Sequence, residues 1–140
     1  MTGGGFQILE HTADAGIVAH GATIEELFAQ CARGMYAVMT DLAGVAERAS
    51  RQVHVEGADA EHLLVAWLLD LLFLTETEGL LFSRFDVSIE DTTLRGTAHG
   101  EPLDHARHEL GGLIKGVTRH MLDVRQEQDG SWRATVLFDV

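Results

Sequence analysis

One segment constrains the fold more than any other: "LLVAWLLDLLFL" at residues 63–74. Asp59 precedes it as a good N-cap, which predicts a helix from there to about Thr75. Apolar residues go nearly all the way round this helix, so it must be largely buried or covered by a partner. A buried carboxylate without a partner is costly. Asp70 is therefore expected to meet a cation or backbone donors, unless it lies on a narrow hydrated stripe.

The rest of the chain is long enough to enclose such a helix. At 140 residues and 46% hydrophobic, it is predicted to form one domain over residues 1–140, with 1–5 as a flexible N-terminal lead. The start lacks a signal-peptide pattern, and the longest apolar run falls short of the roughly 18 residues that span a bilayer. These features predict a soluble, cytoplasmic protein.

Periodicity and capping residues predict the other elements. "TIEE" at 23–26 is a capping box that begins a helix ending near Thr40, with Cys31 on its apolar face. Alternating or apolar runs predict strands at 6–10, 17–20, 51–56, 80–91, 92–102, 113–126 and 131–140, the last two joined by an Asp-Gly turn. The predicted fold class is α+β: a compact single domain with a mostly antiparallel or mixed β-sheet packed against two main helices.

The charge balance narrows the function. The formal net charge is −12 and no basic stripe occurs, so independent nucleic-acid binding is not expected, and neither is membrane binding. Any role in RNA chemistry would act through another protein or a metal ion. The chain has nine arginines and a single lysine, Lys115. A flexible ammonium differs from a guanidinium fork in reach and hydration, so Lys115 is a candidate for a specific task or an accidental surface lysine.

Two aspartates are candidate ligands for a hard cation. Asp14 lies in the "HTADAG" turn, and Asp139 is followed only by Val140, whose carbonyl and terminal carboxylate add oxygens. Such oxygen ligands suit Ca²⁺, Mg²⁺ or Mn²⁺. From the residues alone, a turn aspartate bonded to its own backbone and a solvated C-terminal acid are the favoured interpretation over a metal site.

Histidines form a second candidate group. His99, His105 and His108 lie near Glu101 and Asp104, and a zinc hydrolase would need three such ligands and a general base. No specific ligand spacing occurs in 99–108, and "HARH" at 105–108 lies in a segment predicted to be a loop with solvated histidines. A small metal-dependent hydrolase stays an alternative.

The segments together resemble the archease family. "HTADAGIVAHGATIEELFAQCARGMYAVMTD", "EHLLVAWLLDLLFL", "GEPLDHARHE" with "IKGVTRHMLDV", and "GSWRATVLFDV" are similar to family motifs in the same order, over residues 6–140. Arg119 replaces a usual aromatic, and Leu69 replaces a usually polar residue. These departures concern the details of a contact surface.

The resemblance implies a non-enzymatic activator of an RtcB-type, GTP-dependent RNA ligase in tRNA splicing and RNA repair. The activator would promote guanylylation of the ligase and multiple turnover. The family's metal ligands correspond to Asp14, Asp139 and Val140.

The resemblance also implies contacts with the ligase or its nucleotide. Lys115 in the "IK" motif is a candidate contact for guanine-nucleotide phosphate, or a partner of Asp70. His11 and His120 are further candidates, with structural roles equally open. A chaperone-like protein-binding module, using an exposed apolar face of the second helix, is the remaining alternative.

Overall fold

The computed structural model describes residues 4–9 and 15–140 of the chain. Within these residues, the strands are Gly5–Leu9 (β1), Ala15–Gly21 (β2), Ala49–Glu56 (β3), Leu80–Glu90 (β4), Thr93–Pro102 (β5), Gly116–Gln126 (β6) and Trp132–Asp139 (β7). The helices are Ile24–Met39 (α1) and Ala60–Glu78 (α2), with a short 3-10 helix at Leu42–Gly44. Each predicted element is present, and β1 begins at Gly5, inside the segment expected as a flexible lead.

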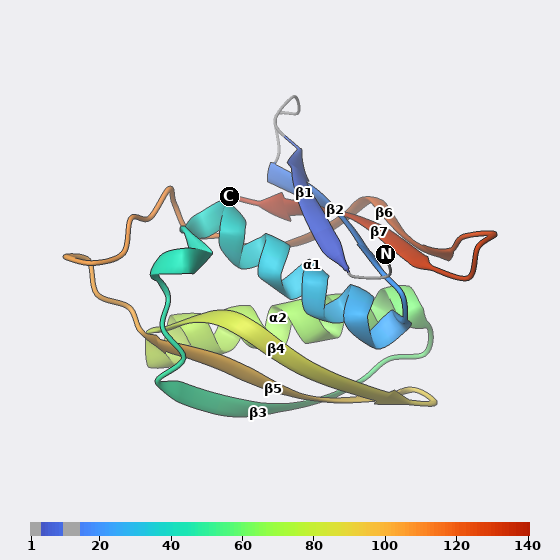
Figure 1. Ribbon diagram of the computed structural model, residues 1–140, viewed down its shortest axis with the longest axis horizontal. Helices are drawn as coiled ribbons and strands as arrows, with labels where there is room; N and C mark the ends of the chain where they lie inside the picture. Colours follow the sequence, from blue (N-terminus) through green and yellow to red (C-terminus); the bar gives the residue numbers. More distant parts are fainter. Residues whose placement is uncertain (1–3, 10–14) are drawn as a thin grey trace.

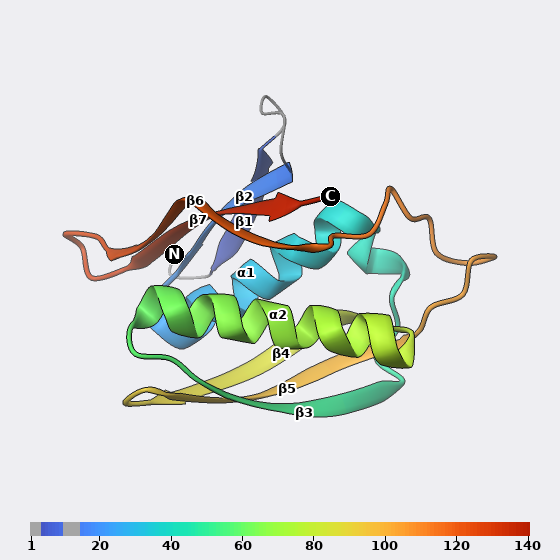
Figure 2. The ribbon, with the colours of Figure 1, turned by 180° about the vertical axis from the view of Figure 1, so that it is seen from behind.

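The strands form two sheets with the helices between them (Figure 1). One sheet has the order β1-β2-β7-β6 and the other β3-β5-β4, and neighbouring strands pair antiparallel throughout the described chain. Seen from behind, α2 lies across the middle layer beneath β6 (Figure 2). The predicted α+β class is confirmed, whereas the division into two sheets is a feature that the sequence did not indicate.

The apolar helix α2 is largely buried, as its sequence predicts, although Leu69 and Phe73 on its outer side are exposed. Leu64, Trp67, Leu68 and Leu71 are fully buried, because one sheet lies on each side of the helix layer. Trp67 Nε1 donates a hydrogen bond to the Phe28 carbonyl on α1 (3.0 Å). Neither α1 nor α2, the α-helices of residues 4–9 and 15–140, combines the length and hydropathy that crossing a membrane requires.

The helix ends follow the expected capping chemistry with one shift. Thr23 Oγ1 accepts from the Glu26 N–H (3.1 Å), as in a capping box, but the Glu26 carboxylate accepts from Ala22 (2.8 Å) instead of Thr23. Asp59 caps α2 by accepting from the His62 N–H (2.8 Å). The helix continues beyond Thr75 to Glu78, because Gly79 at φ 66° supplies the left-handed residue that ends it.

Gly100 lies on β5 where the backbone of β4 approaches it closely. It pairs with Phe82 beside the irregularity in β4, and a Cβ at this position would fall well inside van der Waals distance of the Leu81 carbonyl. The next residue, Glu101, is 1% exposed. Glycine is therefore required at this position, where the paired strands β4 and β5 direct the Glu101 carboxylate into the protein interior.

Replacing Gly100 with alanine is expected to destabilise the fold strongly. Overpacking by one methyl group costs about 1–3 kcal/mol, and here the obstacle is backbone, which cannot rotate away. We expect a loss of about 2 kcal/mol or more in the free energy of unfolding, measured by urea titration with tryptophan fluorescence. Gly44→Ala is the control, since a Cβ there meets nothing within 4 Å. Equal effects of the two substitutions would contradict the packing argument.

Candidate functional site

The C-terminal end of β7 lies beside the start of β6. Asp139 pairs with Gly116, and the Lys115 N–H donates to the Asp139 carbonyl (2.7 Å). A Cβ on Gly116 would lie 3.6 Å from Asp139 Oδ2, so the carboxylate stands over a residue that has no side chain. Asp139 is exposed and Val140 is 63% exposed. The chain end thus presents several oxygen atoms to solvent.

The inner strand β2 begins at the same end of the sheet, next to the end of β7. Ala15 pairs with Phe138, the residue before Asp139. His11 and Asp14, two of the residues singled out in the sequence, lie outside the described residues. Among residues 4–9 and 15–140, no group of three or more His, Cys, Asp or Glu side chains is placed to hold a metal ion. The described part of the predicted metal site is therefore Asp139 with Val140.

Lys115 lies at the mouth of a largely apolar hollow. It is exposed and lines a volume of about 640 Å³ together with Met39, Leu72, Glu76 and Ile114. No ion pair joins Lys115 to any acid of the described chain, Asp70 and Asp139 included. Of the two alternatives for Lys115, the pair with Asp70 is therefore not formed among the described residues, and the contact with a nucleotide phosphate stays a prediction.

Among the described residues, Asp70 does not meet the cation or backbone donors that were the first expectation for its carboxylate. It is half-buried, and partial burial raises the pKa of its carboxyl group. Within the described residues, its side chain meets neither a cation nor a backbone donor. The alternative of a hydrated stripe on α2 holds instead, because Leu69 and Phe73 beside it are 43% and 60% exposed.

His120 stands on an irregular part of β6. The register of β6 against β7 shifts between Thr118 and Asp123, and Met121 inside this bulge has a φ of 58°. His120 is exposed, and its backbone N–H donates to Thr118 Oγ1 (3.0 Å). Its imidazole bonds to no side chain of the described chain, so the structure does not join it to Asp139 or Lys115.

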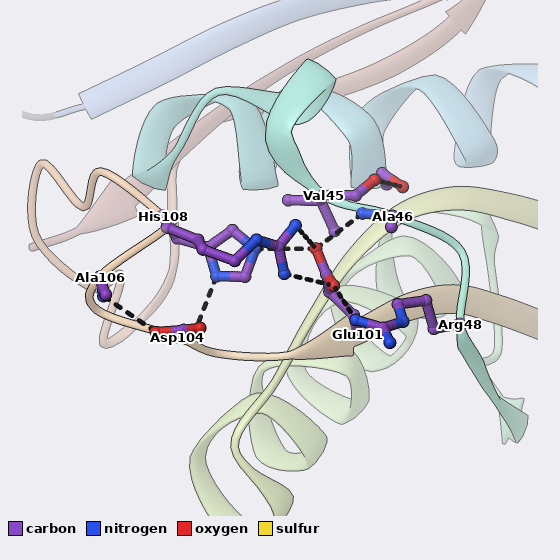
Figure 3. A network of polar contacts seen from close by, with 9 residues as sticks. Val45, Ala46, Arg48, Glu101, Asp104, Ala106 and His108 are labelled. Carbon is purple, nitrogen blue, oxygen red and sulfur yellow. Dashed lines mark hydrogen bonds and ion pairs between the residues drawn. The ribbon is translucent and has the colours of Figure 1, made fainter.

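A buried carboxylate network forms a second polar centre. Glu101 accepts two hydrogen bonds from the Arg107 guanidinium (2.9 and 3.2 Å), one from the Ala46 N–H (2.8 Å) and one from His108 Nε2 (2.9 Å), as Figure 3 shows in part. Arg48 Nη1 lies 3.8 Å from Glu101 Oε1. Hydrogen bonds from Arg107, then Ala46, then His108 lower the pKa of Glu101 to about 2. The network fastens loop 103–109 and residue 46 to the end of β5.

The hydrogen bonds of His108 define its tautomer. Its Nδ1 accepts from the Asp104 N–H (2.9 Å), which requires an unprotonated nitrogen there. The proton is therefore on Nε2, which donates to Glu101. His108 is a buried structural histidine, and the expectation of a solvated loop histidine is wrong for it.

The other histidines of the hydrolase alternative point to different partners. His99 Nε2 bonds to Asp86 on β4 (2.8 Å), while His105 is exposed in the loop. A three-ligand zinc site with His108 is not formed by the described residues. The motif "GEPLDHARHE" contained Glu101, Asp104, Arg107 and His108, but no helical or strand period indicated that the loop would fold back upon its own glutamate.

Known relatives match nearly the whole chain. Residues 6–140 match the archease protein family. The chain is 37% identical to the protein archease of Pyrococcus furiosus over 94% of this chain and 95% of that one, and 40% identical to that of Methanothermobacter thermautotrophicus over 97% and 99%.

Two solved structures are similar to the fold. A solution structure of Methanobacterium thermoautotrophicum protein 1598 is 39% identical with a TM-score of 0.85, over 97% of this chain and 99% of that one. A crystal structure from Thermotoga maritima, described as an archease and possible chaperone, has a TM-score of 0.65 at 23% identity, over 96% of each chain. At that identity, the second likeness concerns the fold alone.

Replacing Glu101 with glutamine is expected to reduce stability at neutral pH and to change its pH dependence. The folded pKa of about 2 lies below the ordinary 4.5, so the ionised network stabilises the fold above pH 4.5 and loses this effect as pH falls toward 2. The difference in urea midpoint between wild type and Glu101→Gln should then be constant from pH 5 to 7 and shrink below. Glu90→Gln, an exposed acid on β4, is the control. A pH-independent difference would contradict this role for ionised Glu101.

Proposed function

Since this chain belongs to the archease family, we propose that it is a non-enzymatic, metal-binding activator of an RtcB-type RNA ligase. It would promote guanylylation of the ligase by GTP and allow multiple turnover in tRNA splicing and RNA repair. The observation that carries the proposal is the pairing of Ala15 with Phe138 in the β2–β7 ladder. The proposed ligands Asp14 and Asp139 are the chain neighbours of these two partners.

The donor chemistry at the chain end supports a hard divalent cation. Asp139 contributes a carboxylate free of any ion pair within the described residues, and Val140 contributes terminal oxygens. Ca²⁺, Mg²⁺ and Mn²⁺ all prefer oxygen ligands of this kind. A divalent ion held there would supply positive charge to phosphate groups of the ligase reaction.

Lys115 supports the same proposal from the neighbouring position. Its backbone N–H holds the Asp139 carbonyl, while its side chain is exposed at the hollow beside it. An ammonium group at this place could bind a nucleotide phosphate that approaches the proposed metal site. The net charge of −12 supports action through the ligase, because the protein offers no basic surface stripe for RNA.

A chaperone-like module is the second candidate, favoured by the exposed apolar residues Leu69 and Phe73 on α2. Such a protein would suppress the aggregation of unrelated clients with or without metal. The ligase activator would stimulate its ligase and show no activity alone. A hydrolase would act as the purified protein and would depend on His105 or His108.

Asp14→Asn and Asp139→Asn are expected to abolish most of the stimulation. Removing a ligand should lower metal affinity by about tenfold or more, since even outer-shell changes cost about 10–100-fold. Ligase turnover is measured at limiting ligase, and Ca²⁺, Mg²⁺ and Mn²⁺ binding to the activator alone by calorimetry. Glu90→Gln is the control for loss of one negative charge. Folded aspartate variants that stimulate normally would overturn the metal-site proposal.

Lys115→Arg tests the lysine separately. Stimulation is expected to fall severalfold, because a guanidinium fork cannot reproduce the reach and hydration of the ammonium group. The free energy of unfolding should change by less than about 0.5 kcal/mol, as for other exposed substitutions. The same turnover assay and urea titration measure both quantities. Full stimulation by the arginine variant would show that any cation suffices there.

A further inference from the structure

The solvent-facing side of α2 is unusually apolar for an exposed helix surface. Leu69 and Phe73, one helical turn apart, are 43% and 60% exposed. Asp70 and Glu76 lie next to them at helical spacing, so these four residues make one continuous strip, here called the α2 outer face. Two large apolar side chains gathered in this way are a surface that a partner can cover.

The α2 outer face continues into the hollow at Lys115. Leu72 and Glu76 line that hollow from α2, and Leu113, which is 48% exposed, lines it from the segment before β6. Its volume of about 640 Å³ exceeds that of any single side chain. The helix strip and the hollow therefore offer both a flat apolar contact and a recess for an inserted group.

Strand β6 runs beside the α2 outer face and exposes one large apolar side chain, Met121. Ile114 shares the hollow with Leu72 near the end of α2, while the Val124 N–H donates to Glu61 near its start (3.3 Å). β6 thus runs along α2 in the opposite direction (Figure 2). Met121, 58% exposed, lies between Ile114 and Val124 in the sequence and follows the exposed Arg119 and His120.

The charges on the α2 outer face itself are negative. Asp70 and Glu76 border its apolar residues, while Lys115 at the hollow and Arg119 on β6 are exposed cations nearby. Partial burial raises the pKa of Asp70, and the described chain provides no cation to offset it. A positive group brought by a partner would stabilise the ionised carboxylate.

We propose that the α2 outer face and the adjoining hollow dock a partner protein. The partner would insert an apolar side chain here, and basic residues on the partner's surface would flank that side chain. This deepens the proposed function and rests on it, since the ligase is then the partner with this chemistry. A second copy fits poorly, because each copy carries −12 and would bring Asp70 and Glu76 toward acids of the same kind.

Two substitutions test the apolar and the charged contribution. Phe73→Ser removes the most exposed apolar side chain of the strip, and Asp70→Lys reverses the charge beside it. Their matched controls are Ile8→Ser, another exposed large apolar residue (38%), and Glu90→Lys on the opposite sheet. Binding to the full-length ligase of the same organism is measured by calorimetry at low and high salt, with ligase turnover measured in parallel. Circular dichroism checks that each variant is folded.

We expect Phe73→Ser and Asp70→Lys each to weaken binding by about tenfold or more, as for a central interface anchor, while both controls bind like wild type. Wild-type affinity should fall with salt, and Asp70→Lys should lose that dependence in part. Asp139→Asn should bind normally and fail to stimulate, which separates docking from activation.

Three results would overturn the docking proposal. If wild type binds and stimulates and both α2 variants do the same, the docking proposal fails while the proposed function stands. If wild type neither binds nor stimulates, both fail together. If sedimentation shows a wild-type dimer that Phe73→Ser dissociates while ligase binding is unchanged, the surface belongs to a second copy.

Discussion

The rest of the structure depends on the burial of α2 on two opposite sides. A helix with apolar residues nearly all round cannot be satisfied by one sheet, so a second sheet has to close the layer from the other side. Trp67 and Tyr36 join the helices inside that layer, through hydrogen bonds to Phe28 and Leu71. The hydroxyl and indole donors thus have partners in a core where an unpaired polar group would be costly.

The same arrangement of sheets also determines where the last residues of the chain lie. The sheet that covers them from above has β2 and β7 at its centre, paired from Ala15 with Phe138 to Gly21 with Trp132. β6 borders β7, so the segment with Lys115 meets the last residues of the chain. Residues far apart in the sequence are thereby assembled at one edge, which is where the proposed cation site and the hollow lie next to each other.

The buried Glu101 network has a different purpose from the chain end. Every bond to its carboxylate comes from a residue that anchors a loop, and His108 is held as a neutral donor by the Asp104 N–H. Because the imidazole of His108 and the carboxylate of Glu101 already satisfy each other's hydrogen bonds, the network has a structural role. It leaves the exposed acids and the lysine at the chain end as the groups available for function.

The sequence alone determined the elements and the class of fold, because hydrophobic period, N-caps and turn residues are local properties. Thr23, Asp59 and the Asp-Gly turn marked boundaries that the structure keeps to within a few residues. The family motifs also singled out Asp139 and Lys115, but their contact across β6 and β7 is seen only in the structure. Only the tertiary structure decided that there are two sheets, that Asp70 has no cation in the described chain, and that His108 is buried against Glu101. These outcomes depend on strand order and loop closure, which bring distant residues together and leave no periodic signal in the sequence.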